Sequence, residues 1–144
     1  MKKFLTLLAA FGCAVALAAC SSNKVNYDEL AGHRFVLVSH NGIAPATTSN
    51  PVIEFRSEVN SDLIKVSGKM CNGFNATAKY TNGVLQSNQV AMTKAICSET
   101  ELNMLDIDIV RMLADGVKVK KSGDKLILST PTQTLIYQNQ DIKN

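Results

Sequence analysis

The sequence has no tryptophan, only two histidines and three prolines, and few aromatic residues of any kind. It also lacks a C-x-x-C pair and a G-x-S-x-G motif, which argues against thioredoxin-like redox chemistry and against an α/β-hydrolase nucleophile. Its lysines and arginines form no cluster of the kind that indicates nucleic-acid binding. We therefore expect no nucleic-acid partner, no cofactor, no metal and no catalytic residues.

The N-terminus has the layout of a secretory signal. Lys2 and Lys3 precede an uncharged run over residues 4–19, which is too short for a membrane-spanning helix. The run ends in Leu17-Ala18-Ala19-Cys20, which resembles the lipobox of bacterial lipoproteins. The resemblance implies cleavage before Cys20 and acylation of that residue, which anchors a protein stably when two or more chains are attached. An ordinary secreted protein without lipid is the alternative.

The remaining chain has the length of one domain. We predict a signal peptide at 1–19, a lipidated tether at 20–27, a domain at 28–138 and a polar tail at 139–144. Loss of Lys2 and Lys3 lowers the formal charge from +3 to +1. By the lipoprotein resemblance, Ser21 after the cysteine favours the outer membrane, with the domain in the periplasm. We expect a monomer.

Hydrophobic patterns predict about eight short strands and one helix. The strands are expected near residues 35–38, 52–56, 63–67, 74–80, 84–86, 89–93, 117–120, 125–129 and 134–137. Apolar residues then recur at helical spacing over 99–114: Leu102, Leu105, Ile109, Met112 and Leu113. Ser98 and Glu101 have the spacing of a capping box, and Gly116 follows the helix end. We expect an antiparallel α+β fold, a partly open β-barrel or two-sheet sandwich plugged by helix 99–114.

Cysteine usage predicts one disulfide. Cys13 leaves with the signal and Cys20 is used for lipid, so Cys71 and Cys97 remain in an oxidising compartment. A bridge between them would stabilise the fold by roughly 3.5 kcal/mol in the loop-entropy model. The alternatives are a redox pair, or a zinc site that would need His33 and His40 as further ligands.

Two groups of charged residues are expected to have structural and not catalytic roles. Asp106 and Asp108 are two apart on the expected helix, so they point in different directions, and we expect a solvated face instead of a paired acid and base. Lysines gather around the hairpin formed by residues 117–129: Lys118, Lys120, Lys121 and Lys125. The simplest interpretation is protection of an edge strand, and the alternative is contact with anionic headgroups.

Two cysteine-centred stretches carry a family resemblance. Gly68-Lys69-Met70-Cys71-Asn72 with Phe74-Asn75, and Met92-Thr93-Lys94-Ala95-Ile96-Cys97, resemble the two signatures of META domains. Phe35 stands where many members have tryptophan. The resemblance implies an envelope lipoprotein linked to heat and novobiocin-type antibiotic stress, and it supplies no catalytic residue.

The leading hypothesis is a non-enzymatic stress protein, held at the membrane through Cys20, that contacts an unknown envelope protein or ligand. A periplasmic hydrolase and a carrier of an apolar ligand are the alternatives, the second because a small barrel with an inserted helix can hold one chain.

Overall fold

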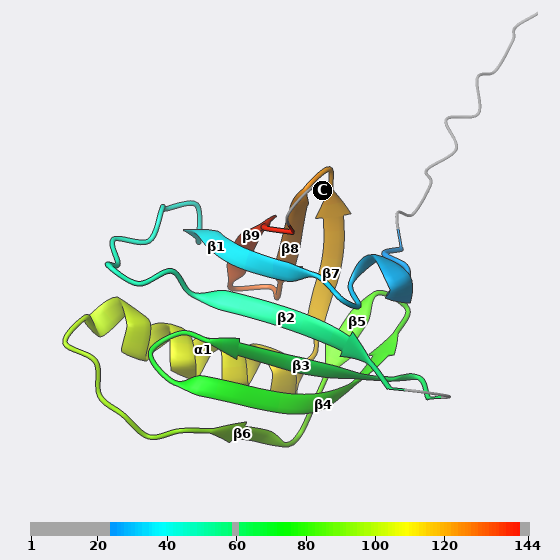
Figure 1. Ribbon diagram of the computed structural model, residues 1–144, viewed down its shortest axis with the longest axis horizontal. Helices are drawn as coiled ribbons and strands as arrows, with labels where there is room; N and C mark the ends of the chain where they lie inside the picture. The colour runs from blue at the N-terminus through cyan, green and yellow to red at the C-terminus, as the bar shows by residue number, and fades with distance from the viewer. Residues whose placement is uncertain (1–23, 59–60, 142–144) are drawn as a thin grey trace, which may run out of the picture.

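Antiparallel strands wind into a barrel with one helix packed against it (Figure 1). The computed structural model describes residues 24–58 and 61–141. Its elements are the 3₁₀ helix η1 (Tyr27–Glu29), the strands β1 (Arg34–His40), β2 (Val52–Ser57), β3 (Leu63–Lys69), β4 (Gly73–Thr81), β5 (Val84–Gln86) and β6 (Val90–Met92), the helix α1 (Thr100–Asp115), and the strands β7 (Val117–Ser122), β8 (Lys125–Ser129) and β9 (Thr134–Asn139). The predicted α+β class is confirmed, and the helix lies within one residue of its expected bounds.

The barrel is closed by strand pairing. Eight strands form a ring in the order β1, β2, β3, β4, β5, β7, β8, β9, and β9 pairs again with β1. The ninth strand, β6, pairs with β4 outside this ring. A closed ring leaves no free edge among its eight members, so the described part of the sheet has its free edge at β6.

The interior of the barrel is filled by side chains. Alternate residues of the strands point inward, and the largest fully buried ones include Phe35, Phe55, Phe74 and Tyr137. Phe35 and Phe55 meet edge to face at 6.0 Å between ring centroids. Phe35 thus occupies the core, as expected for an aromatic at the family's tryptophan position. Burial raises the pKa of the Tyr137 phenol well above its ordinary value.

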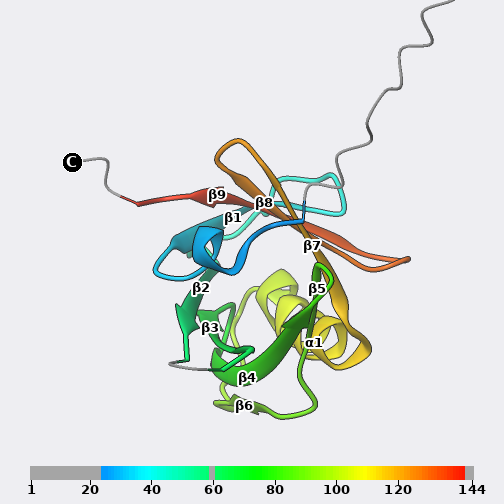
Figure 2. The same cartoon turned by 90° about the vertical axis from the view of Figure 1, so that its right-hand side faces the viewer.

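Helix α1 covers one side of the barrel (Figure 2). Its apolar stripe of Leu102, Leu105, Ile109, Met112 and Leu113 is buried, as the spacing predicted. The helix ends at Asp115 because Gly116 takes a positive φ of 91°, which few residues with a Cβ adopt. Within residues 24–58 and 61–141, no helix has both the length and the apolar character needed to cross a bilayer.

The predicted capping box at the helix start is wrong. The N-cap is Glu99, and its side chain makes no capping bond. Asn103 instead joins the helix to the segment before it: its side-chain NH2 donates to the carbonyls of Cys97 (2.8 Å) and Glu99 (3.2 Å), and its oxygen accepts the backbone N–H of Cys97 at 3.0 Å. The Glu101 carboxylate does not turn back to the helix start because it accepts the backbone N–H of Ala46, in the loop between β1 and β2, at 3.1 Å.

Both ends of the domain extend further than the sequence predicted. Val25, placed in the tether, is buried, and its carbonyl accepts the Tyr80 hydroxyl at 2.8 Å. Tyr27 donates its hydroxyl to the carbonyl of Leu63. At the other end β9 continues to Asn139, and Asp141 bonds to His33. Val25, Tyr27, Asn139 and Asp141 therefore contact the barrel from outside the predicted bounds of 28–138. The predicted signal and Cys20 lie outside the described residues.

Candidate functional site

The two cysteine-centred stretches meet in one cluster, which we call the clasp: the buried residues Cys71, Asn72 and Asp106 and the half-buried Cys97. Cys71 and Asn72 lie in the turn between β3 and β4, and Cys97 lies three residues before α1. Cys71 and Cys97 form a disulfide in the structure, with their Cα atoms 5.8 Å apart. The turn of the sheet is thereby joined covalently to the start of the helix.

Asn72 holds the second stretch in place. Its side chain is buried, and its amide donates to the Ala95 carbonyl at 2.9 Å and to Asp106 Oδ2 at 2.7 Å. Its oxygen accepts from the Ala95 N–H at 2.7 Å and from the Thr93 hydroxyl at 2.9 Å. Every donor and acceptor of the amide is used, so the residue orients the loop and has no free group for a ligand.

Asp106 is buried, whereas the sequence predicted that it would lie on a solvated face of the helix. Only 7% of it is exposed, so it does not lie on a solvated face. It accepts the backbone N–H groups of Cys71 (3.2 Å) and Asn72 (3.1 Å) besides the Asn72 amide. A helical step of four from Leu102 places position 106 on the buried stripe, and this was the signal for its burial. The carboxylate is compensated by three donors, as a buried charge requires.

The clasp is suited to holding structure and unsuited to catalysis. Both thiols are consumed in the disulfide, and the amide and carboxylate are fully bonded within the cluster. A nucleophile or general base would need a free lone pair directed at a substrate site.

Gly68 lies in the same stretch, and packing explains why this position is a glycine. A Cβ there would lie 2.3 Å from the Val52 carbonyl oxygen and 2.7 Å from the Phe74 ring.

Asp108 is also buried, which corrects the second half of the same interpretation. It is 8% exposed and lies on the opposite flank of the stripe from Asp106. Its Oδ2 is 3.3 Å from Nε2 of His40 at the end of β1. The approach is close enough for an ion pair, yet Nε2 makes no hydrogen bond of acceptable geometry within the described chain. The contact brings α1 against β1.

His33 lies at the other end of β1. Its Nδ1 contacts the carboxylate of Asp141, which also accepts the Arg34 N–H at 3.2 Å. The hydrogen bond from His33, together with the Arg34 amide, lowers the pKa of Asp141 below its ordinary value. The two histidines therefore have separate carboxylate partners, and neither meets the cysteines. The described residues contain no group of three or more potential metal ligands.

No hydroxyl or thiol of the described residues bonds to either imidazole. A His–Asp pair activates a nucleophile only when such a group is within hydrogen-bond reach on the other ring nitrogen. The structure thus offers no support for the hydrolase alternative.

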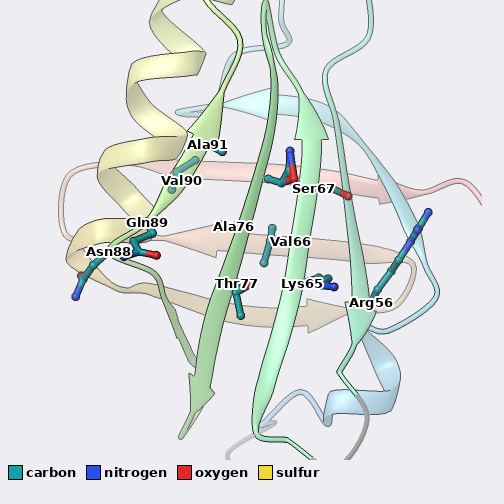
Figure 3. Close-up of a pocket in the computed structure, with 11 residues that line it drawn as sticks. Arg56, Lys65, Val66, Ser67, Ala76, Thr77, Asn88, Gln89, Val90 and Ala91 are labelled. Atoms are coloured by element: carbon teal, nitrogen blue, oxygen red, sulfur yellow. The ribbon is translucent and has the colours of Figure 1, made fainter.

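A hollow of about 710 Å³ lies on the outside of the barrel (Figure 3). Arg56 and Lys65 extend from β2 and β3 on one side, and Asn88 and Gln89 precede β6 on the other. Ser67, Asn75 and Thr77 lie between them. These side chains are spread over β2, β3, β4 and the segment before β6, and none is a histidine, cysteine or carboxylate. Such a surface can form hydrogen bonds but holds no acid–base pair.

A smaller hollow, about 400 Å³, runs between β6 and α1 and is lined mainly by apolar atoms of Met92, Ile107, Val110 and Ala114. Ile107 is 58% exposed, so the outer face of the helix carries apolar surface in addition to its buried stripe. We call this hollow the β6–α1 groove.

Comparison with known proteins assigns the chain to a family. The model of the META domain matches residues 28–142. The chain belongs to the META domain family. It is 36% identical over the full length of both chains to the protein named Heat shock protein HslJ of Escherichia coli (strain K12).

Solved structures share this fold. One NMR structure is 38% identical, has a TM-score of 0.73, and is matched over 83% of this chain and 99% of its own. An NMR structure of a protein from Burkholderia xenovorans is 17% identical with a TM-score of 0.59, over 78% of this chain and 85% of its own, and shares the fold.

Proposed function

We propose that this META-domain chain is a stress-associated, lipid-anchored envelope protein that acts by contact and not by catalysis. The observation that carries the proposal is the clasp, because the family's signature residues are spent on a buried, fully bonded structural cluster. The full-length similarity to a protein named for heat shock supports the stress association. A link to novobiocin-type antibiotic stress, which the family resemblance implies, belongs to the same proposal. The lipobox resemblance supports the anchor at Cys20.

The β6–α1 groove is the surface best suited to a protein partner. Thr93 donates its N–H to the Gly73 carbonyl at 3.1 Å, and Asn75 is paired with Ala91. In this register the backbone groups of Val90 and Met92 point away from β4. No strand of the described chain pairs with that edge. An extended segment of a partner could add to β6 and place apolar side chains against Ile107.

A filled interior argues against the carrier alternative. Phe35, Phe55 and Tyr137 are fully buried in the barrel, together with the stripe of α1. An acyl chain inside the barrel would have to displace these side chains and leave their contacts unmade. We therefore do not retain the carrier.

The test is site-specific photocrosslinking in cells before and after a heat shift. A photoreactive residue at Ile107, in the β6–α1 groove, is expected to give a discrete crosslinked product after the shift. The matched position is Thr77 on the outer face of β4, which should give none. The same products from both positions, or none from Ile107, would contradict the contact surface.

The catalytic alternative and the anchor have their own tests. Turnover of an ester, peptide or glycan by the purified protein, lost in His33→Ala or His40→Ala, would overturn the non-enzymatic proposal. Labelled palmitate should enter the wild-type protein and not Cys20→Ser, and equal incorporation would remove the anchor.

A further inference from the structure

Four lysines gather on one side of the barrel where the described chain begins. Lys118 and Lys120 stand on the outer face of β7, and Lys121 and Lys24 border the same hollow of about 590 Å³. Both ribbon views place the start of the described chain beside β7 (Figures 1 and 2). We call these four residues the lysine face. Lys24 lies more than ninety residues from β7 in the sequence, so only the fold shows that it is close to the other three lysines.

The charges of the lysine face are not neutralised within the described chain. The ion pairs of that part join His33 to Asp141, Arg34 and Arg56 to Glu54, His40 to Asp108, and Lys65 to Glu58, and they leave these four lysines out. Glu29 borders an adjoining hollow with Lys24 and Lys121, and Asp124 lies in the next turn. Lysines still outnumber carboxylates there by four to two.

The chain start sets how far this face can lie from a lipid on Cys20. Val25 is fixed by burial and by its bond from Tyr80, so the domain holds the chain firmly at that point. Lys24 is four residues along the chain from Cys20, and an extended chain spans at most about 3.6 Å per residue, or about 14 Å here. The side of the domain nearest the anchor is therefore the lysine face, and the limit of about 14 Å is less than two Debye lengths of about 8 Å each.

We propose that the lysine face docks on anionic phospholipid headgroups of the leaflet that holds the anchor. The proposal deepens the proposed function and rests on its lipid anchor for the orientation of the domain. Charge complementarity selects the occupant: ammonium groups without acidic partners, held close to a bilayer, meet the headgroup phosphates first. Docking would turn the β6–α1 groove, on another side of the barrel, toward the periplasm and its proteins.

The test uses the mature chain, residues 20–144, with Cys20→Ser, so that binding depends on the protein surface alone. Phosphatidylcholine vesicles with and without phosphatidylglycerol are compared by co-sedimentation at low and physiological salt. We expect binding only with phosphatidylglycerol, weakened by salt. Lys118→Gln with Lys120→Gln should weaken it by about five-fold per lysine, or about 25-fold together.

The control removes the same charge elsewhere. Lys69→Gln with Lys94→Gln changes two exposed lysines at the end of β3 and in the loop after β6, and should change binding less than three-fold or so. Equal losses in the two double variants, or no preference for phosphatidylglycerol, would overturn the docking proposal and leave the anchor untouched. Failure of palmitate labelling with intact vesicle binding would remove the anchor and the orientation derived from it.

Discussion

The clasp and the lysine face handle polar groups in opposite ways. In the clasp a carboxylate and an amide are withdrawn from water, and each finds its full set of partners. On the lysine face four ammonium groups border a surface hollow, and the ion pairs of the described residues include none of them. A buried polar group left unpaired costs stability, whereas an exposed charge costs almost none. The contrast separates residues that hold the fold from residues available for binding, and the following changes test it in order of decreasing effect.

The largest effect on stability is expected at Asp106. Asp106→Ala removes the acceptor of three buried donors, the N–H groups of Cys71 and Asn72 and the Asn72 amide. Stranding these donors should lower the free energy of unfolding by about 3–5 kcal/mol. Denaturant unfolding of the oxidised protein measures the change. Asp115→Ala is the matched control, because Asp115 lies exposed on the same helix, and it should stay within about 0.5 kcal/mol of wild type. Similar losses from both would show that the clasp is not what stabilises this region.

The disulfide comes next. Cys71→Ser and Cys97→Ser should each lower stability by roughly 2–5 kcal/mol, because the reduced chain regains the entropy of an open loop. The double variant should lose about as much as either single one, since the two residues act as a unit. Thiol counting on the native protein is the accompanying measurement. Two freely reactive thiols, or additive losses, would reopen the interpretation of these residues as a redox pair.

These two predictions differ in how far the sequence alone supports them. The two stretches around Cys71 and Cys97, and the apolar stripe of α1, follow from local patterns, so the fold class and the helix could be predicted. The role of Asp106 could not be derived so directly, because two aspartates in a helix usually face water. Position 106 does fall four residues after Leu102, yet only the fold shows that the turn at Asn72 supplies its donors.

Features that depend on distant segments were beyond the sequence. The capping box at Ser98 and Glu101 fits the local pattern, but the carboxylate of Glu101 bonds to the loop at Ala46. The sequence places Val25 in a polar tether, but in the structure it is buried and its carbonyl accepts the Tyr80 hydroxyl. In each case the partner lies far along the chain, where neither propensity nor period carries information.

A smaller effect is expected from Asp141, a carboxylate that is only half-buried. Hydrogen bonding to His33 and Arg34 holds its pKa below the ordinary value in the folded protein. Its contribution to stability is therefore present above the unfolded pKa and is lost as pH falls through the folded pKa. Asp141→Asn should cost less than about 1 kcal/mol at neutral pH. Wild type and variant should converge in acid, as followed by denaturant midpoints, and a difference that widened below pH 4 or so would contradict this sign.

The smallest effect on unfolding is expected from the lysine face itself. Lys118→Gln with Lys120→Gln removes two exposed charges from the outer face of β7, where neither has an ion-pair partner within the described chain. The free energy of unfolding should stay within about 0.5 kcal/mol of wild type, with any change toward higher stability because repulsion among the four lysines is reduced. The same protein should lose most of its binding to phosphatidylglycerol vesicles. Measuring unfolding and vesicle binding on one preparation therefore separates the two regions, since Asp106→Ala is expected to reduce stability and, while folded, to bind vesicles as wild type does. Equal damage to stability from the lysine changes would mean that β7 needs these side chains for its own packing, and the lysine face would no longer be a surface left free for a membrane.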